Sequence, residues 1–123
     1  MLAYRLLAIA AFLTVPGSAM AQPPVYTVNV ASFSFAPKPI LLKSGQAVTL
    51  TFVNGSGNGH DFTAKEFFAA STISAGAAPG GKIDLAPHET KSITLIPRLG
   101  TYQAHCSHFL HASMGMTNTI VVN

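Results

Sequence analysis

Alternation of apolar and polar residues dominates the chain from residue 25 onward, and turns rich in glycine and proline separate the alternating stretches. In the clearest stretch, 47–53, Val48, Leu50 and Phe52 fall on one face and the residues between them on the other. This period of two predicts a half-buried strand. Further strands are predicted over 25–33, 40–43, 82–85, 89–96, 100–105 and 117–122. Short strands at this spacing predict an all-β antiparallel sandwich.

One segment, 64–71, is helix-like. We interpret it as a short amphipathic turn that covers the edge of the sandwich, with Phe67 or Phe68 filling that edge. A functional role for this segment is the less favoured interpretation.

The first residues have the features of an export signal. A short basic start at 1–5 precedes an apolar run over 6–15, which is too short to span a bilayer. An A-x-A cleavage signal follows at 19–21. We therefore predict a secretory signal peptide over 1–21, a single folded domain over 22–123 and a periplasmic location. An uncleaved membrane anchor is less favoured, because the apolar run is short and a cleavage site follows at once.

Charge narrows the classes of partner. The formal net charge of the whole chain is +3, and removal of Arg5 with the signal peptide leaves six basic residues against four acidic ones. A charge of this size does not indicate binding to nucleic acid. It mildly favours acidic redox partners. The predicted mature chain has the length of one small domain with one core.

Candidate chemistry is concentrated near the carboxyl end, where the only cysteine, Cys106, precedes His111 and Met116. Thiolate and thioether sulfur select copper(I), and imidazole suits both oxidation states of copper. A second histidine would complete a plane of two histidines and one cysteine, and His60 is the best candidate. A lone buried thiol that only packs is the plainer interpretation of Cys106. Ligation explains more, because three other ligand-type residues, His105, His108 and His111, lie within five positions of it.

These residues give the chain a resemblance to the cupredoxins, the blue-copper family, over about 26–122. The pattern Cys-x4-His-x4-Met resembles the ligand loop of phytocyanins, the tail 111–123 is similar to the end of plastocyanin, and the segments 33–40 and 43–54 resemble the opening of small bacterial cupredoxins. Two features depart from these relatives. Plastocyanin has two residues between cysteine and histidine where this chain has four, and phytocyanins have a disulfide that a single cysteine cannot form.

The resemblance implies a Greek-key sandwich holding one type 1 copper, with His60, Cys106 and His111 in the plane and Met116 as the weak axial ligand. It implies a periplasmic one-electron carrier that is not an enzyme. Electrons would pass through the exposed edge of His111, with Phe109, Leu110, Ala112 and Met114 around it. The expected partner is a cytochrome or a copper or haem oxidoreductase that docks transiently. We expect a monomer with no attachment to the membrane after cleavage.

Two polar residues are candidate tethers around the site. Many cupredoxins have asparagine after the first ligand histidine, and this chain has Asp61 there. Its carboxylate can accept hydrogen bonds from the hydroxyl or backbone of Ser107, while adding negative charge near the metal. Asn54 is the second candidate. A simple surface acid is an equally favoured interpretation of Asp61.

Four further ligand-type residues exceed the needs of one copper: His88, His105, His108 and Met114. Strand alternation places His105 opposite Cys106. His108 is too close to Cys106 for the usual loop geometry, Met114 competes with Met116, and His88 fits a solvated turn. These residues leave open a role in copper tolerance or delivery. A copper enzyme is disfavoured by the short chain, and a zinc site by the thioether, which is rarely a zinc ligand.

Overall fold

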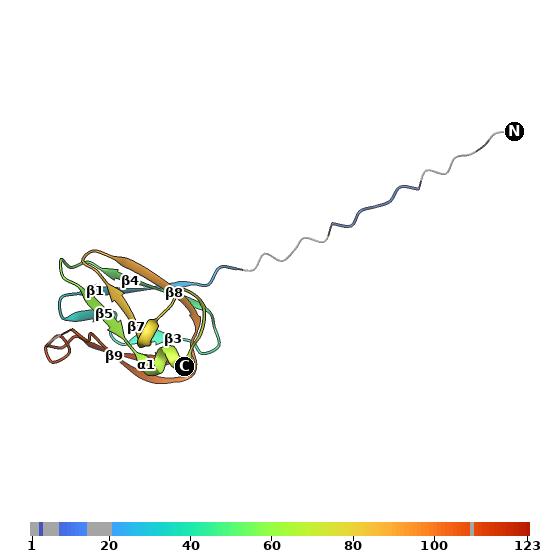
Figure 1. Cartoon of the computed structure of the whole chain (residues 1–123). Helices are drawn as coiled ribbons and strands as arrows, with labels where there is room; N and C mark the ends of the chain where they lie inside the picture. The colour runs from blue at the N-terminus through green and yellow to red at the C-terminus, as the bar shows by residue number, and fades with distance from the viewer. Residues whose placement is uncertain (1–2, 4–7, 15–20, 109) are drawn as a thin grey trace.

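Along the central strands buried and less buried side chains alternate, so each sheet has one face that packs into the core. The computed structural model describes residues 3, 8–14, 21–108 and 110–123. Along β4 (Val48–Asn54) every second side chain is buried, which includes Val48, Leu50 and Phe52 as the alternation predicts. Two five-stranded sheets pack these faces against each other (Figure 1).

The first sheet has the strand order β2-β1-β4-β8-β6, and the second has the order β3-β10-β9-β5-β7. From β3 to β9 each strand lies in the opposite sheet from the strand before it, so the connections cross the sandwich in Greek-key fashion. The predicted all-β sandwich is thereby confirmed. The remaining strands are β1 (Val25–Ala31), β2 (Ser34–Ala36), β3 (Ile40–Leu42), β5 (His60–Thr63), β6 (Thr72–Ala75), β7 (Lys82–Leu85), β8 (Thr90–Ile96), β9 (Gly100–His105) and β10 (Thr117–Val122).

The predicted helical segment is the helix α1 (Lys65–Ala70), and a 3-10 turn, η1 (Pro79–Gly81), lies before β7. Phe67 and Phe68 of α1 are both buried. The ring of Phe67 lies 5.3 Å from that of Phe68 and 5.5 Å from that of Tyr102. The helix therefore closes one edge of the core with both aromatic side chains, which confirms the packing interpretation.

Two details of the strands differ from the prediction. The predicted strand 25–33 ends at Ala31, and a turn containing Phe33 at φ 62° separates it from β2. The strand β6 was not predicted; all its side chains are exposed, and it pairs with β8 at the sheet edge. An edge strand of this kind has no burial pattern from which alternation could reveal it.

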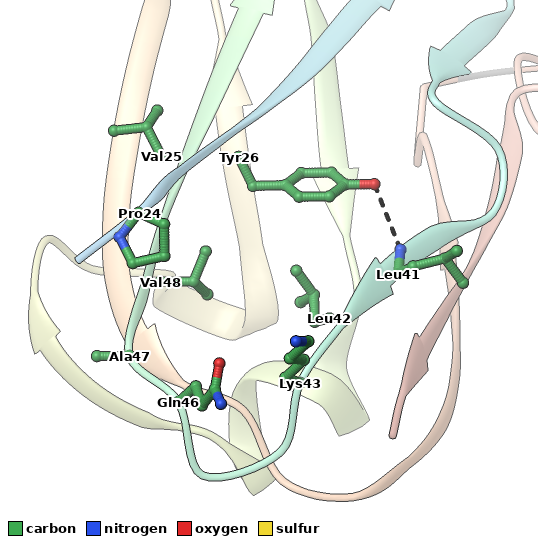
Figure 2. A pocket seen from close by; sticks show the side chains of 9 residues that line it. All are labelled: Pro24, Val25, Tyr26, Leu41, Leu42, Lys43, Gln46, Ala47 and Val48. Atoms are coloured by element: carbon green, nitrogen blue, oxygen red, sulfur yellow. Dashed lines mark hydrogen bonds between the residues drawn. The ribbon is translucent and has the colours of Figure 1, made fainter.

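The register of the strands separates two ends of the sandwich. β1 runs parallel to β4 and β3 runs parallel to β10, so the starts of β1 and β4 lie at the same end as the end of β10. That end holds an apolar pocket of about 280 Å³, lined by Tyr26, Leu41 and Val48 among others. Figure 2 shows the Tyr26 hydroxyl accepting a hydrogen bond of 3.3 Å from the backbone N–H of Leu41 across this pocket. The loop that joins β9 to β10 lies at the opposite end (Figure 1).

The region predicted to be a signal peptide is described only at residues 3, 8–14 and 21, which carry no helix or strand. Figure 1 shows residues 8–14 extended away from the sandwich. Within the described ranges, no helix is both long and apolar enough for a membrane span. The signal-peptide assignment remains a prediction.

Candidate metal centre

Three strand ends place the predicted ligands at one end of the sandwich. His60 is the first residue of β5, Cys106 follows the last residue of β9, and Met116 precedes the first residue of β10. The loop between the last two strands closes on itself, because the N–H of Cys106 donates to the carbonyl of Met116 at 3.1 Å. The N–H of Met116 in turn donates to the carbonyl of His111 at 3.0 Å. Paired strands therefore position His60, Cys106 and Met116, and the hydrogen-bonded loop positions His111.

Three donor atoms from these elements face one another. The Nδ1 atoms of His60 and His111 are 3.2 Å apart, and the sulfur of Cys106 lies 4.0 Å from the first and 3.4 Å from the second. The circle through three points at these separations has a radius of about 2.1 Å, close to the ~2.0–2.3 Å bonds that a first-row metal of this size makes to imidazole nitrogen and thiolate sulfur. The donor set therefore fits a copper ion in its plane without rearrangement of the backbone.

Burial differs sharply among the predicted ligands. His60 is 2 % exposed and Cys106 and Met116 are 0 % exposed, whereas His111 is half-buried. The competing thioether, Met114, is 58 % exposed. The structure thus places Met116 in the interior beside the backbone of Cys106 and leaves Met114 at the surface. This difference favours Met116 over Met114 as the axial ligand.

The surroundings of His60 favour its neutral imidazole, which is the form that binds a metal. Burial lowers the pKa of His60, and the nearby imidazoles of His111 and His108 lower it further against the opposing charge of Asp61. A neutral imidazole keeps the lone pair that a metal needs. Burial also raises the pKa of Cys106, although backbone N–H groups of Asp61 and His108 oppose this effect. The thiol therefore stays protonated until a metal displaces its proton.

Asp61 lies inside the site and is 1 % exposed, so its interpretation as a surface acid is wrong. One carboxylate oxygen accepts the backbone N–H of Ser107 at 2.9 Å and the hydroxyl of Thr63 at 2.7 Å, and the other accepts the Ser107 hydroxyl. Burial alone would raise the pKa of Asp61, but these hydrogen bonds hold it below its usual value. The backbone N–H of Asp61 also points to the sulfur of Cys106 at 3.5 Å. Asp61 thus ties β5 to the ligand loop, as predicted for a tether.

Asn54, the second predicted tether, holds the turn that leads into His60. Its amide nitrogen donates to the carbonyls of Asn58 and Ala86 at 2.8 and 3.0 Å, and its oxygen accepts the N–H of Ser56 at 3.0 Å. Because the side chain is 1 % exposed, these bonds satisfy a buried amide. They fix the glycine-rich segment before β5.

The surplus histidines separate into two groups. His88 and His105 are exposed, and His105 lines a separate pocket with Lys65 and Lys82 instead of facing the donor atoms. His108 lies beside the donor atoms, against expectation. Its ring stacks on that of His111 with centroids 5.3 Å apart, and its Nε2 is 3.6 Å from a carboxylate oxygen of Asp61.

One neighbour of the site escaped the sequence prediction. The ring of Phe33 meets that of His111 edge-on with centroids 5.2 Å apart. It lies far from the ligand loop in sequence, and a turn between β1 and β2 carries it to the site. Of the residues predicted around His111, Leu110 and Met114 are exposed and Ala112 is half-buried, while Phe109 lies outside the described residues.

Comparison with known proteins also indicates a copper-binding protein. Residues 25–123 match the family of copper binding proteins described as the plastocyanin/azurin family. The chain is 34 % identical to chloroplastic plastocyanin of Oryza sativa subsp. indica over 117 residues, which cover 94 % of this chain and 72 % of that protein. The matched region includes the whole sandwich.

Solved structures share the fold. Auracyanin of Roseiflexus castenholzii superposes with a TM-score of 0.61 at 20 % identity, over 85 % of this chain and 99 % of that one. The multicopper oxidase McoA of Aquifex aeolicus gives a TM-score of 0.63 at 16 % identity, but only 29 % of its chain is covered. The chain, with its fold, its donor geometry and its relatives, is a member of the plastocyanin/azurin family of copper-binding proteins and has a single type 1 copper site.

Proposed function

We propose that this protein is a one-electron carrier whose copper is held by His60, Cys106 and His111, with Met116 as axial ligand. The observation that carries the proposal is the triangle of two Nδ1 atoms and one sulfur at one end of a strand frame. Copper bound there supplies a one-electron couple between copper(I) and copper(II). Ligands on rigid elements change position little, which limits the reorganisation that each transfer requires.

The residues around the sulfur have a tuning role. The N–H groups of Asp61 and His108 approach the Cys106 sulfur, and such bonds favour the reduced state by withdrawing charge from it. The carboxylate of Asp61 acts in the other direction, because its negative charge favours copper(II). The balance between these groups sets the reduction potential.

The exposed edge of His111 is the proposed point of electron exchange. Three exposed apolar side chains, Phe33, Leu110 and Met114, lie at this end of the sandwich and form what we call the apolar rim. Phe33 contacts His111 directly, and Leu110 and Met114 belong to its loop. A small apolar surface around a half-buried ligand suits brief docking of a cytochrome or a copper or haem oxidoreductase.

We also propose a periplasmic location after removal of residues 1–21, action as a monomer and no enzymatic activity of its own. The basic start, short apolar run and A-x-A sequence support export.

The optical spectrum of the copper(II) form tests the copper ligands. The wild-type protein should show an intense thiolate-to-copper band, and Cys106→Ser should abolish it while far-ultraviolet circular dichroism shows an intact sandwich. Serine supplies a hard hydroxyl in place of a soft thiolate. A serine variant that keeps the intense band would rule out Cys106 as the ligand. Reversible voltammetry and fast exchange with a cytochrome would then test the role as a carrier.

A role in copper tolerance or delivery is the second candidate. The proximity of Asp61 and His108 to Cys106 favours it, because a handling protein needs additional donors. Titration of the reduced protein with copper(I) against a competing chelator separates the roles. We expect one tight equivalent, unchanged in His105→Ala/His108→Ala. A second colourless equivalent that vanishes in the double variant, with loss of copper tolerance in the host, would favour the handling role.

A further inference from the structure

A second set of donor atoms lies beside the triangle already described. Asp61, Cys106 and His108 offer a carboxylate oxygen, a sulfur and a ring nitrogen that all lie within 4.8 Å of one another. The two sets share Cys106 and differ in the other two residues. Because both sets use the sulfur of Cys106, they are candidates for successive positions of one ion.

Exposure distinguishes the two sets. In the inner set only His111 reaches solvent, whereas in the outer set the side chain of His108 is 41 % exposed beside an Asp61 carboxylate that is 1 % exposed. His108 therefore spans the distance between bulk water and the buried sulfur. Its ring also adjoins both inner histidines, with centroids 5.3 Å from His111 and 6.2 Å from His60.

The ring of His108 has no hydrogen bond to Asp61 that would explain where this side chain lies. The carboxylate of Asp61 already accepts bonds from Ser107 and Thr63, which satisfy both of its oxygens. The imidazole stands 3.6 Å away, beyond hydrogen-bond length. A nitrogen, an oxygen and a sulfur donor at this spacing nevertheless suit a copper ion, whose preferred ligands include all three in its two oxidation states.

We propose that Asp61, Cys106 and His108 form a transfer position for copper, on which an arriving or leaving ion rests before it moves to or from the inner set. The sulfur of Cys106 stays bound during the move, while His60 and His111 replace Asp61 and His108. Binding of copper(II) displaces the thiol proton to water, and no electron is exchanged. The proposal rests on the copper site and is independent of the electron-carrier role.

A kinetic experiment on His108→Ala tests the transfer position. Apoprotein is mixed with copper(II) sulfate while the thiolate-to-copper band is followed, and copper(I) is removed from the reduced protein by a chelator. We expect loading and removal both to slow by about tenfold, as for loss of one stabilising contact from the rate-limiting step. Because only a barrier changes, affinity and the position of the band should stay those of the wild type. His105→Ala is the matched control, since His105 is also an exposed neighbour of Cys106 but faces another pocket.

Unchanged rates in His108→Ala would overturn the proposal, and so would equal slowing in His105→Ala. A changed band position or affinity in His108→Ala would also overturn it, because His108 would then act on the resident copper. A wild-type protein without the band would instead refute the copper ligands themselves, so the two failures are distinguishable.

A second variant isolates the outer set. In His111→Ala the inner set is incomplete, so copper(II) should settle on Asp61, Cys106 and His108 and give a shifted thiolate band. Addition of His108→Ala to this variant should abolish the shifted band, and addition of His105→Ala should not. Retention of the band without His108 would contradict the proposal.

Discussion

Ser107, in the loop after β9, donates both its backbone N–H, at 2.9 Å, and its hydroxyl to the carboxylate of Asp61 on β5. The bond joins the strand that begins with His60 to the loop that begins with Cys106. The two ligand-bearing elements are thereby locked by a buried charge where many relatives of this family have a neutral amide.

Replacement of that charge should raise the reduction potential. Asp61→Asn keeps an oxygen for the Ser107 N–H but removes a negative charge that favours copper(II). Two unit charges about 5–8 Å apart at an effective dielectric constant of ~20 predict a rise of roughly 90–140 mV in voltammetry. Asp84→Asn is the matched control, because Asp84 pairs with Asp61 in register but its side chain is 61 % exposed and therefore screened. Equal shifts in both variants would contradict a local effect.

Asp61 should also set the acid stability of the apoprotein. Its pKa is lowered in the folded state, so the ionised carboxylate contributes stability above the ordinary aspartate range and loses it as the pH falls through the lowered pKa. Urea unfolding of the wild-type apoprotein should therefore weaken on acidification below about pH 4 more steeply than that of Asp61→Asn. Parallel curves for the two proteins would show that another group controls acid unfolding.

The axial position should respond to Met116 and not to Met114. Met116→Leu removes a weak donor that favours copper(II), so the potential should rise while the copper stays bound by the other ligands. Met114→Leu changes an exposed residue and should leave the potential unchanged. Voltammetry of both variants decides the assignment, and a shift seen only with Met114→Leu would reverse it.

The two histidines should differ in their rescue by free imidazole. His111→Ala opens a gap at the surface, through which added imidazole can restore the original absorption band. His60→Ala leaves a gap behind a residue that is 2 % exposed, so the same concentration should restore little. The measurement is band intensity against imidazole concentration. Equal recovery in both variants would be inconsistent with this placement.

The aromatic contacts of α1 should contribute to the free energy of unfolding and should not affect the absorption band of the copper form. Phe67→Ala removes a fully buried ring that packs on Phe68 and Tyr102, and a cavity of this kind costs about 3–5 kcal/mol of the free energy of unfolding. Denaturant unfolding measures the loss. The absorption band of the folded, copper-loaded variant should stay at its wild-type wavelength, and a displaced band would link the helix to the metal site.

The sequence by itself was enough to predict those strands that have one buried face and one more exposed face. Alternation in β4 identified the core residues Val48, Leu50 and Phe52, because a side chain on every second position must face the other sheet. The spacing of Cys106, His111 and Met116 identified the chemistry, because few residue types bind copper and all three are in one loop. Exposed β6 and the break before Phe33 carried no such signal.

Tertiary structure alone decided which residues meet. The burial of Asp61 depends on the pairing of β5 with its neighbours and on the turn of the ligand loop, which no local pattern encodes. Phe33 reaches His111 only because the sheets bring distant segments together. His108 illustrates the same limit, since its spacing from Cys106 made it an unfavoured ligand while the folded loop places its ring against that of His111. Residue types define which metal the chain can bind, and the packing of distant strands defines which side chains surround it.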